Sequence, residues 1–132
     1  MGYYTYYTMT AEDFVTKEPV SGRLAELLDQ EVFDRVGVFE GGNCADGWYG
    51  SAKWYDHDRD MLILAWRFPG VLFTLHGEGD NQDDLWMSYY LNGRMQYCPA
   101  VITYEDFDPG KLEPAEKLDL KDPLLRYTYE SY

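Results

Sequence analysis

DHDRDMLILAWRFPGVLFTLHGE, residues 56–78, places the clearest helix of the chain directly before one of its clearest strands. Apolar residues recur at helical spacing in its first half, at Met61, Leu64, Ala65 and Phe68. Asp56 is positioned to cap this helix, and the acids that follow suit the positive end of the helix dipole. Pro69-Gly70 ends the helix, and residues 71–78 are then predicted to form a strand.

The flanking sequence predicts one more helix and four more strands. The helix covers residues 19–34 with its cap near Ser21, and residues 38–47 form a glycine-rich loop. The strands are predicted over 3–9, 48–55, 85–91 and 94–104. Asn92-Gly93 predicts a type I′ hairpin turn. Gly50 indicates a bulge or a close backbone approach, and Pro99 an edge strand or a bulge.

This order, β-α-β-α-β-β-β, predicts the α+β class. Short joints on either side of the second helix favour a right-handed crossover between parallel strands 48–55 and 71–78. We expect one domain over residues 1–132, folded as a two-layer sandwich. Its mixed, mostly antiparallel sheet has about five strands, with both helices on one face. Residues 105–132 are expected to be an irregular, acidic, proline-containing segment with at most one short helical turn.

The chain is strongly acidic, with 24 Asp and Glu against 11 Lys and Arg and a formal charge of −13. Such a field repels DNA, RNA and anionic membranes and attracts basic partners. Direct nucleic-acid binding is therefore not predicted. The competing interpretation is that the charge only maintains solubility.

The sequence also indicates a cytoplasmic protein. The first ten residues contain no basic region of a secretory signal, and the longest apolar run, MLILAW at 61–66, is too short to span a bilayer. Cys44 and Cys98 belong to no CxxC or Cys/His pattern, so two reduced thiols are expected rather than a disulfide.

No motif predicts catalysis or a cofactor. A calcium loop starting at Asp80 would need Gly at position 85 and Glu at position 91, and both positions are Leu. The two histidines, His57 and His76, lie in no zinc-binding pattern, and no serine lies in a GxSxG turn. We therefore predict no enzyme and no metal. A looser divalent-cation site in the acidic connection between the third and fourth strands stays open, built from Glu78, Asp80, Asp83 and Asp84.

The same connection is the best candidate for recognition. No Lys or Arg lies between Arg67 and Arg94, so its acids form a concentrated negative surface. Strand alternation puts Trp86 and Tyr90 on one face and Leu85, Met87, Tyr89 and Leu91 on the other, the better candidates for the core. Predicted partner-binding residues are therefore Glu78, Asp80, Asp83, Asp84, Trp86 and Tyr90. In the alternative, the helices cover the Trp86 face and the connection is a solvated turn.

Two strings in this region carry a resemblance, KWYDHDRDM and FPGVLFTLHGEGDNQDDLWMSYYLNG. They are similar to a group of small proteins from bacteriophages and related mobile elements, which has no established activity. The likeness covers roughly residues 53–112 and the first ten residues. It departs at Asp80-Asn81, where a second acid more often follows GEG. The resemblance implies a phage or mobile-element protein in a bacterial cytoplasm, and it carries over no functional residues.

Charge and setting together favour an anti-defence protein, such as an anti-CRISPR or anti-restriction inhibitor. Its carboxylates would take the place of DNA phosphates in the groove of a basic host nuclease or another nucleic-acid-binding defence factor. Two other functions stay open: a module that binds a small ligand through tyrosine-rich strands, and an immunity protein against a basic toxin. The oligomeric state is open as well.

Overall fold

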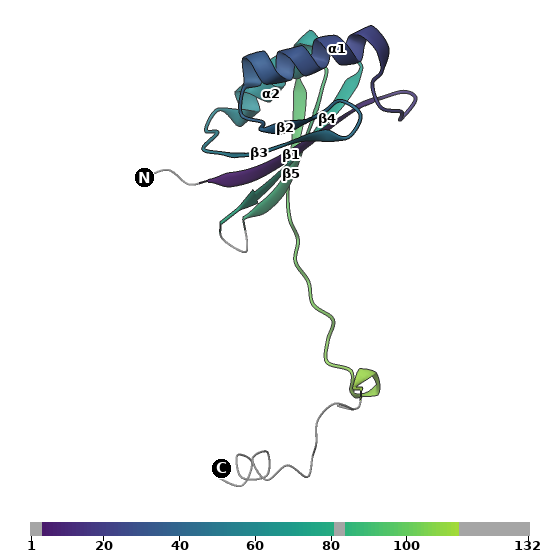
Figure 1. Ribbon diagram of the computed structural model, residues 1–132. Helices are drawn as coiled ribbons and strands as arrows, with labels where there is room; N and C mark the ends of the chain where they lie inside the picture. The colour runs from purple at the N-terminus through teal and green to yellow at the C-terminus, as the bar shows by residue number, and fades with distance from the viewer. Residues whose placement is uncertain (1–3, 81–83, 114–132) are drawn as a thin grey trace. The chain divides into compact units, whose positions relative to one another are not determined.

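The computed structural model describes residues 4–80 and 84–113. Its contacts divide the chain into two units, residues 1–101 and 102–132, which we describe separately. The first unit contains a six-stranded sheet and two α-helices, α1 (Gly22–Glu31) and α2 (His57–Arg67) (Figure 1). The strands are β1 (Thr5–Asp13), β2 (Gly41–Asn43), β3 (Gly47–Ala52), β4 (Val71–Gly79), β5 (Leu85–Leu91) and β6 (Arg94–Pro99).

The sheet has the order β2-β3-β1-β4-β5-β6, and every neighbouring pair is antiparallel. The predicted parallel pair is therefore wrong. The strands β3 and β4 do run in the same direction, but β1 lies between them and pairs with both. The strands β1 and β2 likewise run parallel with β3 between them, so the region from β1 to β4 has the interlocked split β-α-β arrangement of ferredoxin-like domains.

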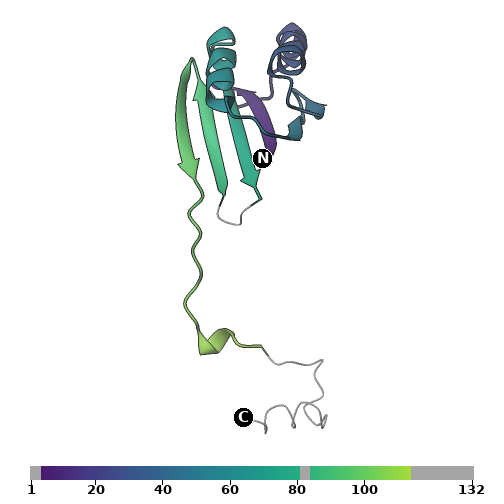
Figure 2. The same cartoon turned by 90° about the vertical axis from the view of Figure 1, so that its left-hand side faces the viewer.

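The predicted α+β sandwich is confirmed, because α1 and α2 cover the same face of the sheet (Figures 1 and 2). Along β1, Tyr7, Met9 and Ala11 alternate toward the helices and are buried, while the residues between them face the open side. From the helices, Leu28 and Met61 pack onto this layer without exposure to solvent. Burial of these apolar side chains is the main force that holds the two layers together.

Element ends differ from the sequence prediction where local signals are weak. The strand β1 extends to Asp13, a short edge strand β2 forms inside the predicted loop, and β6 ends at Pro99 instead of residue 104. The edge predicted from Pro99 is confirmed, because β6 is the last strand of the sheet. After α1 the chain continues as one π-helical turn over Val32–Val36.

The hairpin predicted at Asn92-Gly93 is confirmed. Both residues have positive φ, 52° and 77°, as a type I′ turn requires. The Asn92 side chain also accepts a hydrogen bond from the Gly70 N–H at 2.8 Å. The close approach predicted at Gly50 is confirmed too, since a Cβ there would lie 2.6 Å from the Val38 carbonyl oxygen.

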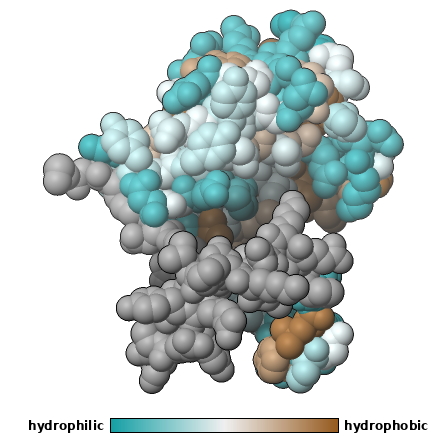
Figure 3. Space-filling model, turned by 60° about the horizontal axis from the view of Figure 1, so that its bottom comes forward, coloured by the Kyte–Doolittle hydropathy of each residue, from teal (hydrophilic) through white to brown (hydrophobic). Residues whose placement is uncertain are grey.

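In the second unit, residues 102–113 are described. They are extended apart from one 3-10 turn at Pro109–Lys111, which begins where the Asp108 side chain accepts a hydrogen bond from the Gly110 N–H at 2.9 Å. Lys111 forms an ion pair with Glu105 at 3.0 Å. Exposed apolar side chains occur along this stretch, and Figure 3 shows a hydrophobic patch on it.

Candidate functional site

The acidic connection begins and ends on a closed pair of strands. The Gly79 N–H donates to the Asp84 carbonyl at 2.8 Å, which extends the β4–β5 ladder to the base of the connection. Glu78 and Asp80 are exposed and Asp84 is half-buried. Among residues 4–80 and 84–113, none of these three carboxylates forms an ion pair with a Lys or Arg. The fourth predicted acid of the connection, Asp83, lies outside the described residues.

The first turn of α2 contributes further acids at the same end of the sheet. The His57 ring stacks on Trp86 with 5.0 Å between ring centroids and 24° between planes, so α2 begins beside the start of β5. We call the carboxylates of these two segments the acidic end: Asp56 and Asp58 at the start of α2, on the helix face, Asp84 beside the start of β5, and Glu78 and Asp80 at the end of β4, with Glu78 on the open face. Figure 2 shows that the adjoining ends of β4 and β5 project beyond the helices. The nearby cations are Lys53, over the Tyr4 ring, and Arg59, 3.7 Å from Asp60.

Helix capping explains only part of the DHDRD string. Asp56 occupies the N-cap position, but its side chain makes no capping hydrogen bond. The Tyr90 hydroxyl donates to Asp58 at 2.7 Å, and the Trp54 indole N–H donates to Asp60 at 2.8 Å. These buried aromatic residues therefore hold two carboxylates of the first turn in fixed positions on the sheet.

The expected exposure of Trp86 and Tyr90 is wrong. Trp86 is only 8 % exposed and Tyr90 is 0 % exposed, because the helices cover the face of β5 that carries them. Trp86 packs among Tyr7, His57 and Tyr97. The residues proposed from sequence as aromatic anchors for a partner are thus core residues, and Tyr90 instead positions Asp58.

Burial changes the acidity of three groups in this layer. Desolvation, followed by the hydrogen bond and the charge of Asp58, raises the pKa of Tyr90 far above its ordinary value. Burial also raises the pKa of Tyr7, and it raises the pKa of the Cys44 thiol to about 11. Cys44 and Cys98 are both free, and the high pKa of the buried Cys44 opposes thiolate chemistry.

Neither a metal centre nor an activated hydroxyl emerges from this geometry. The described parts of the chain contain no group of three or more His, Cys, Asp and Glu side chains placed to hold a metal ion. Ser88 is fully buried between Trp86 and Tyr90 on β5, and its hydroxyl has no hydrogen-bond partner among the described residues. A base that would activate Ser88 is therefore absent from its described surroundings.

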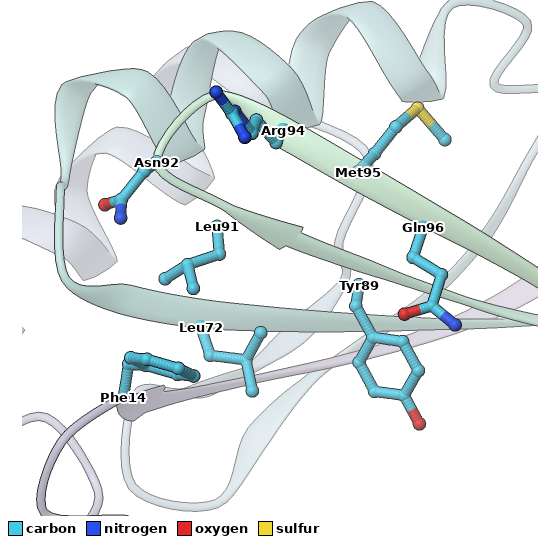
Figure 4. A pocket seen from close by; sticks show the side chains of 8 residues that line it. All are labelled: Phe14, Leu72, Tyr89, Leu91, Asn92, Arg94, Met95 and Gln96. Carbon is cyan, nitrogen blue, oxygen red and sulfur yellow. The ribbon is translucent and has the colours of Figure 1, made fainter.

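The other face of the sheet is covered by no helix among the described residues, and it contains a groove of about 850 Å³ near the β5–β6 turn (Figure 4). The groove is mainly apolar. Its lining residues are Phe14, Leu72, Tyr89, Leu91, Asn92, Arg94, Met95 and Gln96. Toward the acidic end, the same face carries the exposed rings of Tyr4, Tyr6 and Tyr49. Sequence alternation predicted Leu85, Met87, Tyr89 and Leu91 as core residues, whereas all four are half-buried on this face, and Tyr89 and Leu91 line the groove.

Comparison with protein-family models, curated proteins and solved structures gives no match to this chain. Among the described residues, no helix is both long enough and apolar enough to cross a membrane. Sequence reasoning found the acids of the connection but missed those of α2 as part of the same surface. The available signal was the unusual density of three acids in five residues, which capping alone does not require.

Proposed function

We propose that this protein is an anti-defence inhibitor that binds a basic, nucleic-acid-handling host protein through the acidic end. Its carboxylates occupy positions that DNA phosphates would take in the groove of that host protein. A nuclease of a CRISPR or restriction system is the partner class that fits this chemistry. The bacterial cytoplasm is the compartment that the proposal requires.

The observation that carries the proposal is that the acidic first turn of α2 lies beside the start of β5, where the acidic connection ends. Asp58 is held by the Tyr90 hydroxyl, and the acidic connection is closed at its base by the Gly79–Asp84 hydrogen bond. Carboxylates fixed before binding lose little conformational entropy when a partner arrives. They also steer a positively charged partner toward this end during diffusion.

One further consideration supports this proposal. The sequence resemblance of residues 53–112 and the first ten residues implies a phage or mobile element, a setting in which inhibition of host defence is useful.

The test is capture of partners from a bacterial lysate with the tagged full chain, at low and high salt, followed by mass spectrometry. We expect a basic nucleic-acid-binding protein that is released at high salt. With that protein purified, Glu78→Lys/Asp80→Lys should weaken binding by at least about tenfold, which corresponds to about 1.4 kcal/mol. Two attractive contacts then become repulsive at the most exposed part of the acidic end.

The matched control is Glu18→Lys/Glu26→Lys, which changes the net charge equally at exposed positions before and within α1, outside the acidic end. It should retain near-normal affinity. Equal losses for both variants would show that only total charge matters, and salt-independent binding would contradict the phosphate-like role. Capture of a basic toxin instead of a defence factor would identify an immunity protein.

The groove on the open face favours a second candidate function, binding of a small ligand. Its apolar lining and its cation, Arg94, suit an apolar molecule with a carboxylate group. A screen of such carboxylates should find a compound that raises the melting temperature of the wild-type protein by several degrees. A ligand that binds only the folded state stabilises that state. The variant Leu91→Asp should lose that rise. If no carboxylate shifts the melting temperature of either protein, this candidate function is wrong.

A further inference from the structure

The edge strand β6 lies in an uncharged part of a strongly acidic chain. No Asp or Glu occurs from Leu85 to Thr103, and Arg94 is the only charged residue there. The side chains of Met95, Gln96 and Tyr97 are exposed. Natural edge strands usually carry charges, bulges or prolines that block pairing with another strand, and within β6 these features are confined to its two ends, Arg94 and Pro99.

The backbone of β6 offers a defined set of unused hydrogen-bonding groups. In a two-residue hairpin, Leu91 and Arg94 form a hydrogen-bonded pair, and Ala100 donates to the Leu85 carbonyl at 2.9 Å. Even-numbered residues of β6 therefore point their N–H and C=O groups toward β5. Odd-numbered residues point theirs outward, so Met95 and Tyr97 each present one free donor and one free acceptor. Among the described residues, no other backbone group bonds to this outer edge.

We propose that two copies of this protein associate through antiparallel pairing of their β6 strands. Gln96 of each copy lies on the two-fold axis, and Met95 of one copy stands opposite Tyr97 of the other. This register uses all four outward groups of Met95 and Tyr97 in each copy. It also leaves Pro99 opposite the turn of the second copy, so the missing proline N–H costs no interstrand bond.

A second copy fits this edge better than a basic peptide does. A basic peptide would need nearby carboxylates to attract its positive charges, and β5 and β6 contain no Asp or Glu. Two copies of this edge meet without the like-charge repulsion that opposes association elsewhere on a chain of charge −13. The exposed Met95 and Tyr97 side chains lie on the helix side of β6 and would pack in cross-strand pairs over the junction.

The first test is sedimentation equilibrium of the full chain over a range of concentrations. We expect a reversible monomer–dimer equilibrium for the wild type. Tyr97→Pro removes one outward N–H and no bond within the copy, so it should raise the dissociation constant at least about tenfold. Tyr97→Thr retains the N–H and serves as the control, with a much smaller change. Circular dichroism and the melting temperature establish that both variants are folded.

The second test addresses the register. Cα atoms of a directly opposed, non-hydrogen-bonded pair lie about 4.5 Å apart, within the range that a disulfide spans. In a Cys98→Ser background, Gln96→Cys should therefore give a disulfide-linked dimer under mild oxidation, whereas Ser51→Cys on β3 should not. A chain that stays monomeric at all concentrations overturns the proposal, as does a dimer that Tyr97→Pro leaves intact. Absence of the Gln96 cross-link from a dimer that Tyr97→Pro dissociates overturns the register.

Discussion

Above about pH 9, the free energy of unfolding is expected to fall steeply as pH rises. Cys44, Tyr7 and Tyr90 are all buried, and burial raises the pKa of each in the folded protein. Above their ordinary values, 9.0 for the thiol and 10.0 for the two phenols, unfolding releases protons that the folded state retains. The stabilisation is therefore complete below these values and is lost as pH rises.

The size of the effect follows from proton linkage. Each proton released on unfolding lowers the free energy of unfolding by about 1.4 kcal/mol per pH unit. Cys44 contributes between pH 9.0 and about 11, and both tyrosines contribute from pH 10.0 upward. Between pH 10 and 11, Cys44 and Tyr90 together give a slope of up to about 3 kcal/mol per pH unit, and the raised pKa of Tyr7 adds to it. Because a domain of this size is stable by about 5–15 kcal/mol, it should unfold within a few pH units.

Urea unfolding monitored by tryptophan fluorescence, from about pH 8 to about pH 10.5, measures this slope. Tyr90→Phe should lose about 1 kcal/mol at pH 8, because the hydrogen bond to Asp58 is lost. Above pH 10 its slope should be shallower by about 1.4 kcal/mol per pH unit. The control is Phe73→Leu, a core substitution directly opposite Tyr90 that removes no titratable group. Equal slopes for Tyr90→Phe and wild type would show that Tyr90 does not contribute to the pH dependence of the free energy of unfolding.

Gly77→Ala is expected to destabilise the protein, although replacing glycine with alanine within a strand normally stabilises the folded state. Replacing glycine within a strand favours folding by about 0.5–1 kcal/mol through the unfolded state. Here, however, the Trp86 ring lies directly over Gly77, and the new Cβ would collide with it. Overpacking of a filled core costs about 1–3 kcal/mol, which exceeds the gain from the unfolded state. The net change in the free energy of unfolding is therefore expected to be destabilising. Because Trp86 also supports His57, the beginning of α2 should loosen as well.

A double-mutant cycle with Trp86→Leu isolates the collision. Urea unfolding should show that Gly77→Ala is destabilising in the wild type but neutral or stabilising in the Trp86→Leu background. Hydrogen exchange at the first turn of α2 provides an independent measure of local loosening. If Gly77→Ala has the same cost in both backgrounds, the indole ring is not the cause.

The sequence predicted the fold best where periodicity and turn chemistry agree. Residues 85–91 and the Asn92-Gly93 turn are examples, since alternation and two positive-φ residues specify the same hairpin. The strand order was not predictable in this way. Short joints around α2 favour β3 and β4 as parallel strands, but no local signal reports that β1 inserts between them. That insertion depends on pairing of β1 with strands distant in the sequence.

The candidate site, like the fold, was predictable from the sequence only in part. The acids of the connection were evident from composition, because they lie in a region without Lys or Arg. The positions of Trp86 and Tyr90 were not evident, because both faces of β5 carry large apolar or aromatic side chains. Alternation separates the two faces without saying which one the helices cover. That choice is made by α2, whose Asp58 accepts the hydrogen bond from Tyr90.

The central position of β1 has a consequence for synthesis of the protein in the cell. This strand is synthesised before both of its partners, which end at Ala52 and Gly79. At translation rates of roughly 5–20 residues per second, several seconds pass before both neighbours of this tyrosine-rich strand have been synthesised. We expect nascent chains to be bound by chaperones during this interval. Ribosome-bound chains that stop before β4 should therefore be protease-sensitive, and protection should appear only after β4 has emerged.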